Sequence, residues 1–289
     1  MFQKPFLKWV GGKTQILKNV MDKFPKEMNN YHEIFLGGGS VLLALLSRED
    51  IVIKGEIYAY DYNETLINLF RDVKENGVEL FLLLKQIVKK YSSIHTQKGS
   101  REPKDINQAI LSKESFYYWI RKQYNQEQES LNKSAMLLFL NKTCFRGLYR
   151  VGPNGFNVPY GHYNTPTFPT EEEMDNISRM ISKVTFICSD FSDSLSRVDK
   201  GDFVYLDPPY APETKKSFVS YTNCGFSNDS HEELFRLTKT LPCSFLMSNS
   251  CVDMVLNNFS EYSIDKIDVR RTINSKNPGK GTLEVLISK

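Results

Sequence analysis

The amino-acid sequence predicts an α/β fold built on a mainly parallel sheet, with a second unit inserted into it. Residues 31–75 follow the order strand, glycine loop, helix, strand, helix, which is typical of the start of a doubly wound sheet. The alternation of strands and helices returns over residues 184–248, whereas residues 77–170 lack it. We therefore expect residues 1–76 and 171–289 to form one α/β domain and residues 77–170 to form an insertion.

In the first part of this domain, the spacing of apolar residues and the boundary residues predict each element. Asn63 can cap the helix that follows the second strand and runs to about Glu75. The predicted elements are a helix over 13–23, a strand over 31–35, a glycine loop over 36–40, a helix over 41–46 and a strand over 57–60 that ends on Asp61.

The insertion is predicted to be mostly helical, with an irregular end. Helices are expected over 78–90, 114–126 and 131–140, and a polar loop over 92–105. Residues 141–170 have no helical period and predict irregular loop and hairpin. This last stretch contains Lys142, Arg146 and Arg150 and no acidic residue, so it can attract phosphates, although solvated surface is an alternative.

The C-terminal part returns to strands and helices. Strands are expected over 184–188, 203–206 and 244–248, with a helix over 230–240. The tail predicts an antiparallel pair over 262–271 and 282–288, joined by a loop rich in glycine, asparagine and lysine.

Composition places the chain among globular proteins and excludes several classes. Of its 289 residues, 40% are hydrophobic, and no apolar run approaches the ~18 residues of a membrane span. The N-terminus has no signal-peptide core and the five cysteines show no CxxC spacing, so we expect a reduced, cytoplasmic protein. The four histidines are scattered, so no metal site is expected, and the net charge of +3 does not identify a partner.

The stretch from Asp207 to Tyr210, Asp-Pro-Pro-Tyr, follows a short apolar strand. Ligands of open α/β sheets bind at the carboxyl ends of the strands. The Asp207 side chain and the Pro208 carbonyl can accept both N–H groups of an exocyclic amine, and Tyr210 can stack on the base that carries it. A strand end followed by a structural Pro-Pro turn is the alternative.

The glycine loop and Asp61 suggest a site for a nucleoside-bearing cofactor. Glycine at 37–39 permits a tight turn and a close approach of a ligand. Asp61, at the end of the next strand, can accept hydrogen bonds from ribose hydroxyls. This pattern fits a dinucleotide and S-adenosylmethionine equally. Trp9 and Lys13 flank Gly11-Gly12 without the P-loop spacing, and they could hold a methionine moiety with its carboxylate.

The segment 141–150 alternates basic and aromatic residues. Arginine can read guanine in the major groove, and Phe145 and Leu148 could insert into a base step and help to extrude a base. An ordered loop whose aromatic side chains pack inward is the alternative.

These motifs, in this order, resemble the Dam-type (α-group, D12 class) DNA adenine-N6 methyltransferases, and the resemblance covers nearly the whole chain. Residues 5–13 are similar to the N-terminal motif of that family, 35–40 to its cofactor loop and Asp207–Tyr210 to its catalytic motif. Residues 247–249 and 269–273 are similar to its late segments. Two positions depart: Ile34 stands where the family usually has proline, and Arg146 where close relatives often have asparagine.

The resemblance implies the fold, the partners and the function of particular residues. The fold is a Rossmann-like S-adenosylmethionine-dependent methyltransferase sheet with an inserted helical and hairpin DNA-recognition domain. Cofactor contacts are implied for Trp9, Lys13, Phe35, Gly37, Asp61 and Asp207, and catalysis for Asp207, Pro208 and Tyr210. DNA contacts are implied for Lys8, Phe145, Arg146, Leu148, Arg150 and Pro159.

We therefore expect a monomeric enzyme that transfers a methyl group to a flipped-out adenine in duplex DNA, within GATC, with no metal and no membrane partner. The resemblance includes restriction-associated enzymes, so a separately acting restriction endonuclease stays open as a partner. Three other interpretations stay open: a methyltransferase for cytosine N4 or an RNA base, a DNA-binding relative without catalysis, and a nucleotide-dependent dehydrogenase.

Overall fold

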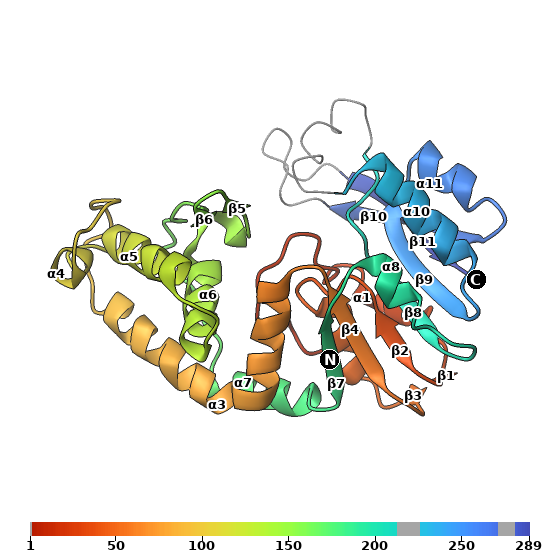
Figure 1. The fold of residues 1–289 in the computed structure, drawn as a ribbon, viewed down its shortest axis with the longest axis horizontal. Helices are drawn as coiled ribbons and strands as arrows, with labels where there is room; N and C mark the ends of the chain where they lie inside the picture. The colour runs from red at the N-terminus through yellow and green to blue at the C-terminus, as the bar shows by residue number, and fades with distance from the viewer. Residues whose placement is uncertain (1, 213–225, 271–280) are drawn as a thin grey trace.

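A central sheet organises the molecule in the computed structural model, which describes residues 2–212, 226–270 and 281–289. Its seven strands lie in the order β10-β11-β9-β8-β2-β4-β7 (Figure 1). Their bounds are β2 (Tyr31–Glu33), β4 (Ile57–Asp61), β7 (Val184–Cys188), β8 (Phe203–Leu206), β9 (Ser244–Ser250), β10 (Ser263–Arg270) and β11 (Gly281–Ser288). The five strands from β9 to β7 are parallel, and β11 runs antiparallel to β9 and β10. The predicted α/β class is confirmed. The loop predicted between the last two strands lies outside the described residues.

Helices cover both faces of the sheet, as a doubly wound fold requires. One apolar cluster contains residues of α1 (Leu17–Met21), α2 (Ser40–Leu46), α3 (Glu64–Ser92) and α7 (Glu171–Met180). The other contains residues of α8 (Phe191–Leu195), α10 (Asn228–Lys239) and α11 (Asp253–Asn258). Strand β8 is buried throughout; Phe203 and Tyr205 belong to the first cluster, and Val204 and Leu206 to the second. This alternation explains why an unbroken apolar run forms a central strand.

The strand order reverses at β2, and this places the candidate site. After β2 the chain adds β4 and then β7 on one side, and afterwards β8 and β9 on the other. The connections that leave the carboxyl ends of β2 and β8 therefore diverge and open a crevice, where α/β proteins bind ligands. The glycine loop follows β2, and Asp207 follows β8.

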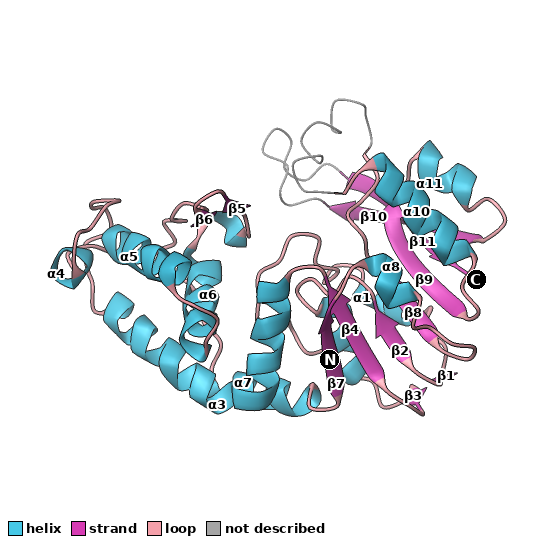
Figure 2. Ribbon diagram, viewed as in Figure 1, coloured by secondary structure: helices cyan, strands magenta, loops and turns pink. Residues whose placement is uncertain are grey.

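Residues between β4 and β7 form a largely helical lobe beside the sheet (Figures 1 and 2). The helices predicted over 63–75 and 78–90 are joined in α3, whose helical angles break at Asn76 (φ −132°, ψ 32°). Asn63 caps α3 as predicted, because its side chain accepts a hydrogen bond from the Leu66 N–H. The lobe continues with α4 (Ile106–Ala109), α5 (Lys113–Gln126), α6 (Leu131–Thr143), the 3-10 turn η1 (Phe145–Gly147) and the hairpin of β5 (Val151–Gly152) and β6 (Gly155–Phe156).

Some elements were not predicted. The shortest are the paired strands β1 (Glu27–Met28) and β3 (Val52–Ile53). Helix α7 carried a readable signal: Thr170 and Glu173 form a capping box, and the acidic block 171–173 occupies its first turn. No helix was predicted over these residues. The helix predicted over 13–23 is wrong at both ends, because α1 covers only Leu17–Met21.

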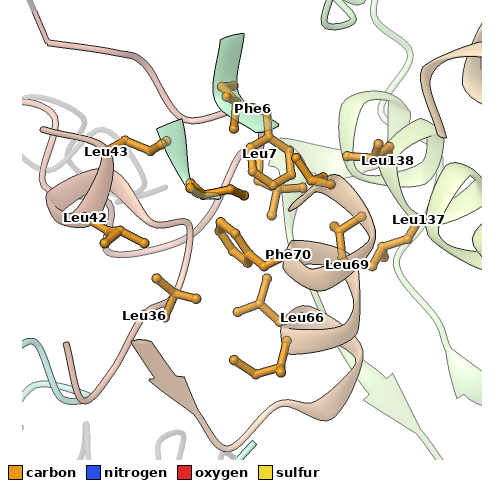
Figure 3. Close-up of a cluster of buried hydrophobic side chains, with 14 of the residues drawn as sticks. Phe6, Leu7, Leu36, Leu42, Leu43, Leu66, Leu69, Phe70, Leu137 and Leu138 are labelled. Carbon is orange, nitrogen blue, oxygen red and sulfur yellow. The ribbon is translucent and has the colours of Figure 1, made fainter. Parts of the chain in front are cut away.

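The N-terminal segment packs between the sheet domain and the helical lobe (Figure 3). Phe6 meets Phe70 of α3 edge-on, with ring centroids 5.1 Å apart. Gly39 lies against the same ring, since a Cβ at that position would come within 2.9 Å of Phe70 Cζ. The glycine loop is therefore held against α3, close to residues 8–13.

Candidate active site

The carboxylate of Asp207 lies between two partners at the end of β8. Its Oδ2 is 2.7 Å from the ammonium Nζ of Lys13, and its Oδ1 accepts a 2.8 Å hydrogen bond from the Ser248 hydroxyl. Lys13 is 5% exposed and Asp207 is 19% exposed, so this ion pair is largely shielded from water. These two contacts hold the Asp207 carboxylate in a fixed position at the crevice, with one of its oxygens paired to a cation.

Tyr210 is held close to this ion pair. The Lys13 Nζ lies 4.9 Å from the centroid of its ring, and its hydroxyl donates a 2.8 Å hydrogen bond to Glu284 Oε2. Burial, with the negative charges of Asp207 and Glu284, raises the pKa of Tyr210 well above its usual value, so its hydroxyl stays a donor. The aromatic ring and the carboxylate of the motif thus share one lysine.

A second carboxyl, that of Glu33, lies buried at the end of β2. It pairs in register with Tyr205 on β8 and accepts a 2.7 Å hydrogen bond from the Tyr31 hydroxyl. Burial raises the pKa of Glu33 to about 8, and the negative charge of Asp207 adds to this shift. Glu33 therefore favours its neutral form near pH 7.

The turn after β2 needs glycine, because of its backbone angles and because neighbouring side chains lie close to it. Gly37 and Gly39 have φ values of +50° and +69°, in the left-handed region that favours glycine. A Cβ at Gly38 would come within 2.9 Å of Trp9 Cβ, so Trp9 covers the loop directly. The Gly37 N–H donates a 2.9 Å hydrogen bond to Asp61 Oδ2, and burial raises the pKa of Asp61. The predicted residues Trp9, Gly37 and Asp61 are thus brought together.

Phe35 lies at the start of the same loop and faces the other side of the sheet. Its ring stacks on that of Phe191 in α8, with centroids 6.1 Å apart, and meets Phe226 edge-on at the same separation. These rings form an apolar wall next to the glycine loop.

A pocket of about 540 Å³ joins the N-terminal segment to the helical lobe. Its lining includes the predicted residues Lys8, Trp9 and Arg146, together with Gly38 and Ser40 of the glycine loop. One cavity thus touches both the loop that follows β2 and the segment expected to contact DNA.

The segment that carries Arg146 is tied to Lys8 by a buried asparagine. The Lys8 N–H donates to Asn141 Oδ1 (2.9 Å), and Asn141 Nδ2 donates to the Lys8 carbonyl (2.7 Å) and more weakly to that of Gly147 (3.4 Å). Arg146 and Gly147 are both left-handed, with φ of 57° and 64°. Gly147 is required there, since a Cβ would come within 2.5 Å of Lys8 Cβ. Trp9 stacks on Tyr149, with centroids 5.4 Å apart.

The other predicted DNA contacts differ in exposure. Phe145 is 45% exposed, and its N–H is bonded to the carbonyl of the exposed Pro159. Arg150 is exposed and held by Asn157, whose side-chain oxygen lies 2.6 Å from its Nε. Leu148 is half-buried and packs against the main apolar cluster, so it is less available to a ligand than Phe145.

The prediction missed Ser248, Glu284 and Asn141. Residues 247–249 stood out only as a late family segment, and no sequence pattern pairs Glu284 with Tyr210. All three act through contacts between elements far apart in the chain.

The residues at the crevice fit a nucleoside-bearing methyl donor. Trp9 lies against Gly37 and Gly38, where an added Cβ would come within 3.1 Å and 2.9 Å of its side chain. Asp61 offers a carboxylate beside the loop, and Lys13 supplies a cation. Within the described residues, no cluster of three or more histidine, cysteine, aspartate or glutamate side chains could bind a metal ion. The described helices include none of the length and apolar character that a membrane span needs.

Comparison with known proteins identifies the family. Residues 9–273 match the D12 class N6 adenine-specific DNA methyltransferases. The Type II methyltransferase M.MjaIII of Methanocaldococcus jannaschii is 35% identical over 300 residues, covering 98% of this chain and 98% of that protein. The DNA adenine methylase of Haemophilus influenzae is 30% identical over 283 residues (96% and 90% covered), and that of Vibrio cholerae is 29% identical over 292 residues (99% and 95%).

The chain therefore belongs to the D12 class of adenine-specific DNA methyltransferases. Its activity is transfer of a methyl group to N6 of adenine in DNA, for which S-adenosylmethionine is the donor. Membership of this family excludes the dehydrogenase interpretation and assigns adenine rather than cytosine as the base.

Proposed function

We propose that this enzyme methylates adenine within GATC in double-stranded DNA, after the adenine has turned out of the base stack. Relatives of nearly full length are named DNA adenine methylase, which supports this reading. The resemblance to GATC methylases implies base contacts for Lys8 and Arg150, and we include both contacts in the proposal. The observation that carries the proposal is the joining of Lys13, Asp207 and Tyr210 at the crevice where the strand order reverses.

The target amine needs help because its lone pair is delocalised into the ring. In our proposal, the Asp207 carboxylate and the Pro208 carbonyl accept its two N–H groups, which returns electron density to nitrogen. Tyr210 stacks on the base and fixes its plane. Rate enhancement then comes mainly from positioning and from fixed electrostatics.

The donor site in this proposal comprises Trp9, Lys13, Phe35, Gly37 and Asp61. When bound, the donor supplies an electrophilic methyl group on a sulfonium centre. The Lys13 ammonium pairs with the donor's carboxylate, Asp61 accepts hydrogen bonds from ribose hydroxyls, and Trp9 covers the glycine loop. Asp207 belongs to this site and to the amine site, so it holds the two reactants together.

DNA recognition is assigned to the insertion, residues 77–170, while residues 1–76 and 171–289 carry catalysis. Arg146 and Arg150 of the insertion, together with Lys8 from the catalytic domain, supply basic side chains for bases and phosphates. In our proposal Phe145 enters a base step and favours extrusion of adenine; its exposure and its backbone hydrogen bonds with Pro159 and Leu148 support this function. A match to a Type II methyltransferase also supports a separate restriction endonuclease as a partner in the same cell.

The test uses the purified chain, an isotopically labelled methyl donor and matched duplexes. One duplex contains GATC, the second contains the same bases in scrambled order, and the third carries N6-methyladenine at the target in both strands. We expect label only in the first, recovered as N6-methyladenine after digestion to nucleosides. Label in the scrambled duplex at the same rate would contradict GATC, and label recovered on cytosine would contradict the assigned chemistry.

A further inference from the structure

The hydroxyl of Tyr210 is anchored by a carboxylate from the far end of the chain. Tyr210 donates a 2.8 Å hydrogen bond to Oε2 of Glu284, which lies on β11 and is only 9% exposed. Burying a polar group costs free energy unless it is hydrogen-bonded, and this contact gives the Glu284 oxygen a donor and the Tyr210 hydroxyl an acceptor. The family motif ends at Tyr210, and nothing in that motif specifies this partner.

The backbone beside Tyr210 is fixed by the same part of the sheet. The Ala211 N–H donates to Asn249 Oδ1 (3.0 Å), and the Ser250 hydroxyl donates to the Ala211 carbonyl (2.6 Å). Ser250 is the register partner of Glu284 across β9 and β11. Strand β9 therefore holds the backbone neighbour of Tyr210, and strand β11 holds its hydroxyl.

The ring is restrained at a second point by Lys13. The Nζ that pairs with Asp207 also lies 4.9 Å from the centroid of the Tyr210 ring. Glu284 fixes the hydroxyl end, and Lys13 lies over the ring. An aromatic ring restrained in this way loses little further freedom when a base stacks on it.

We infer that Glu284 is a positioning residue for catalysis, which holds Tyr210 in the orientation that stacks the target adenine beside Asp207. This inference rests on the proposed function of Tyr210. A carboxyl group suits the task, because its oxygen can accept the hydrogen bond of the Tyr210 hydroxyl. A purely structural Glu284 would instead affect folding and leave the chemical step unchanged.

The kinetic test compares Glu284→Leu, Glu284→Gln, Tyr210→Phe and the double variant Tyr210→Phe/Glu284→Leu. Loss of a hydrogen bond to a charged group predicts that Glu284→Leu and Tyr210→Phe each lower the single-turnover methylation rate by about ten- to a hundredfold, with KM for the donor changed less than about twofold. Glu284→Gln should recover most of the rate, because its amide oxygen still accepts. The double variant should be no slower than the slower single variant. The matched control is the exposed Glu261, replaced by leucine.

A second measurement needs no activity. Thermal unfolding of the same four proteins and the wild type gives a double-mutant cycle, in which coupled side chains show a combined loss smaller than the sum of the single losses. Additive losses, or a Glu284→Leu variant with wild-type rate, would overturn the inference. A wild-type protein that does not methylate DNA would contradict the proposed function, while the unfolding cycle would still decide whether Glu284 and Tyr210 are coupled.

Discussion

The ammonium of Lys13 lies 2.7 Å from Oδ2 of Asp207, so the segment before α1 and the end of β8 share one ion pair. The same ammonium also donates a 2.7 Å hydrogen bond to the neutral Gly11 carbonyl. Breaking a shielded pair leaves the remaining charge without compensation. The cofactor segment and the catalytic motif are therefore energetically dependent on each other.

Replacing Lys13 by methionine should weaken donor binding by roughly ten- to a hundredfold, because a charge-assisted partner of the donor carboxylate is lost. Titration calorimetry with the donor measures this directly. Lys13→Arg should retain part of the affinity, and the exposed Lys18→Met is the control. A dissociation constant equal to that of the wild type would show that Lys13 does not hold the donor.

Replacing Asp207 by alanine should abolish methyl transfer while much of the DNA affinity stays. Loss of a fixed acceptor at the reacting atom predicts a fall of at least about a hundredfold in the single-turnover rate. Labelled methyl incorporation and a DNA-binding titration measure the two quantities on one preparation. The control is the exposed Asp268→Ala on β10. Full activity of Asp207→Ala would refute its assigned function.

Replacing Arg150 by alanine should reduce discrimination of the cognate site by about 1–3 kcal/mol, as expected for a side chain that reads a base. The guanidinium of Arg150 donates a hydrogen bond to Asn157 and is exposed at the surface. Binding to GATC and scrambled duplexes is compared at one salt concentration. Arg179→Ala on α7 is the control for loss of surface charge. The same ratio of the two affinities in variant and wild type would count against base reading.

Replacing Asn141 by alanine should lower the free energy of unfolding by about 1–3 kcal/mol, because the Lys8 N–H and carbonyl lose their buried partners. Chemical denaturation measures the loss, with the exposed Asn107→Ala on α4 as control. Asn141→Asp keeps the acceptor and loses the donor, so an intermediate stability is expected. A stability equal to the wild type in Asn141→Ala would show that this asparagine does not secure Lys8.

Replacing Glu33 by glutamine should stabilise the protein progressively as the pH rises. Burial raises the pKa of Glu33 from 4.5 to about 8, so between these values the folded protein keeps a proton that the unfolded chain releases. Wild-type stability from this group is fully present below about pH 4.5 and falls by up to about 1.4 kcal/mol per pH unit until about pH 8.

The measurement for Glu33 is the difference in unfolding free energy between wild type and Glu33→Gln from about pH 5 to about pH 9, over the window set by its shifted pKa. The exposed Glu261→Gln serves as a control that should show no such trend. A difference that stays constant over this range would contradict a neutral, buried Glu33.

Local patterns in the sequence predicted most of the fold. The apolar run 203–206 and the capping residue Asn63 gave a strand and a helix start that the structure confirms. Helix α7 was missed although Thr170 and Glu173 stand at capping-box spacing, because their polar and acidic neighbours hid a narrow apolar face formed by Met174 and Ile177.

The site was less predictable where it depends on strand neighbours. Spacing and resemblance single out Lys13, Asp61 and Asp207, and the structure places two of them in one ion pair. Ser248 and Glu284 contact the motif because β9 lies beside β8 and β11 lies beside β9 in the sheet, and strand order is a property of the whole fold. No local pattern in the sequence encodes such neighbours.

The most direct measurement is a map of modified bases in the genome of a methylation-free bacterial host that produces either this chain or its Asp207→Ala variant. We expect N6-methyladenine at GATC throughout the genome with the wild type, and none with the variant at equal protein level. Methyl groups on another base, or equal methylation by both proteins, would contradict the assignment of Asp207 as the acceptor that holds the adenine amine.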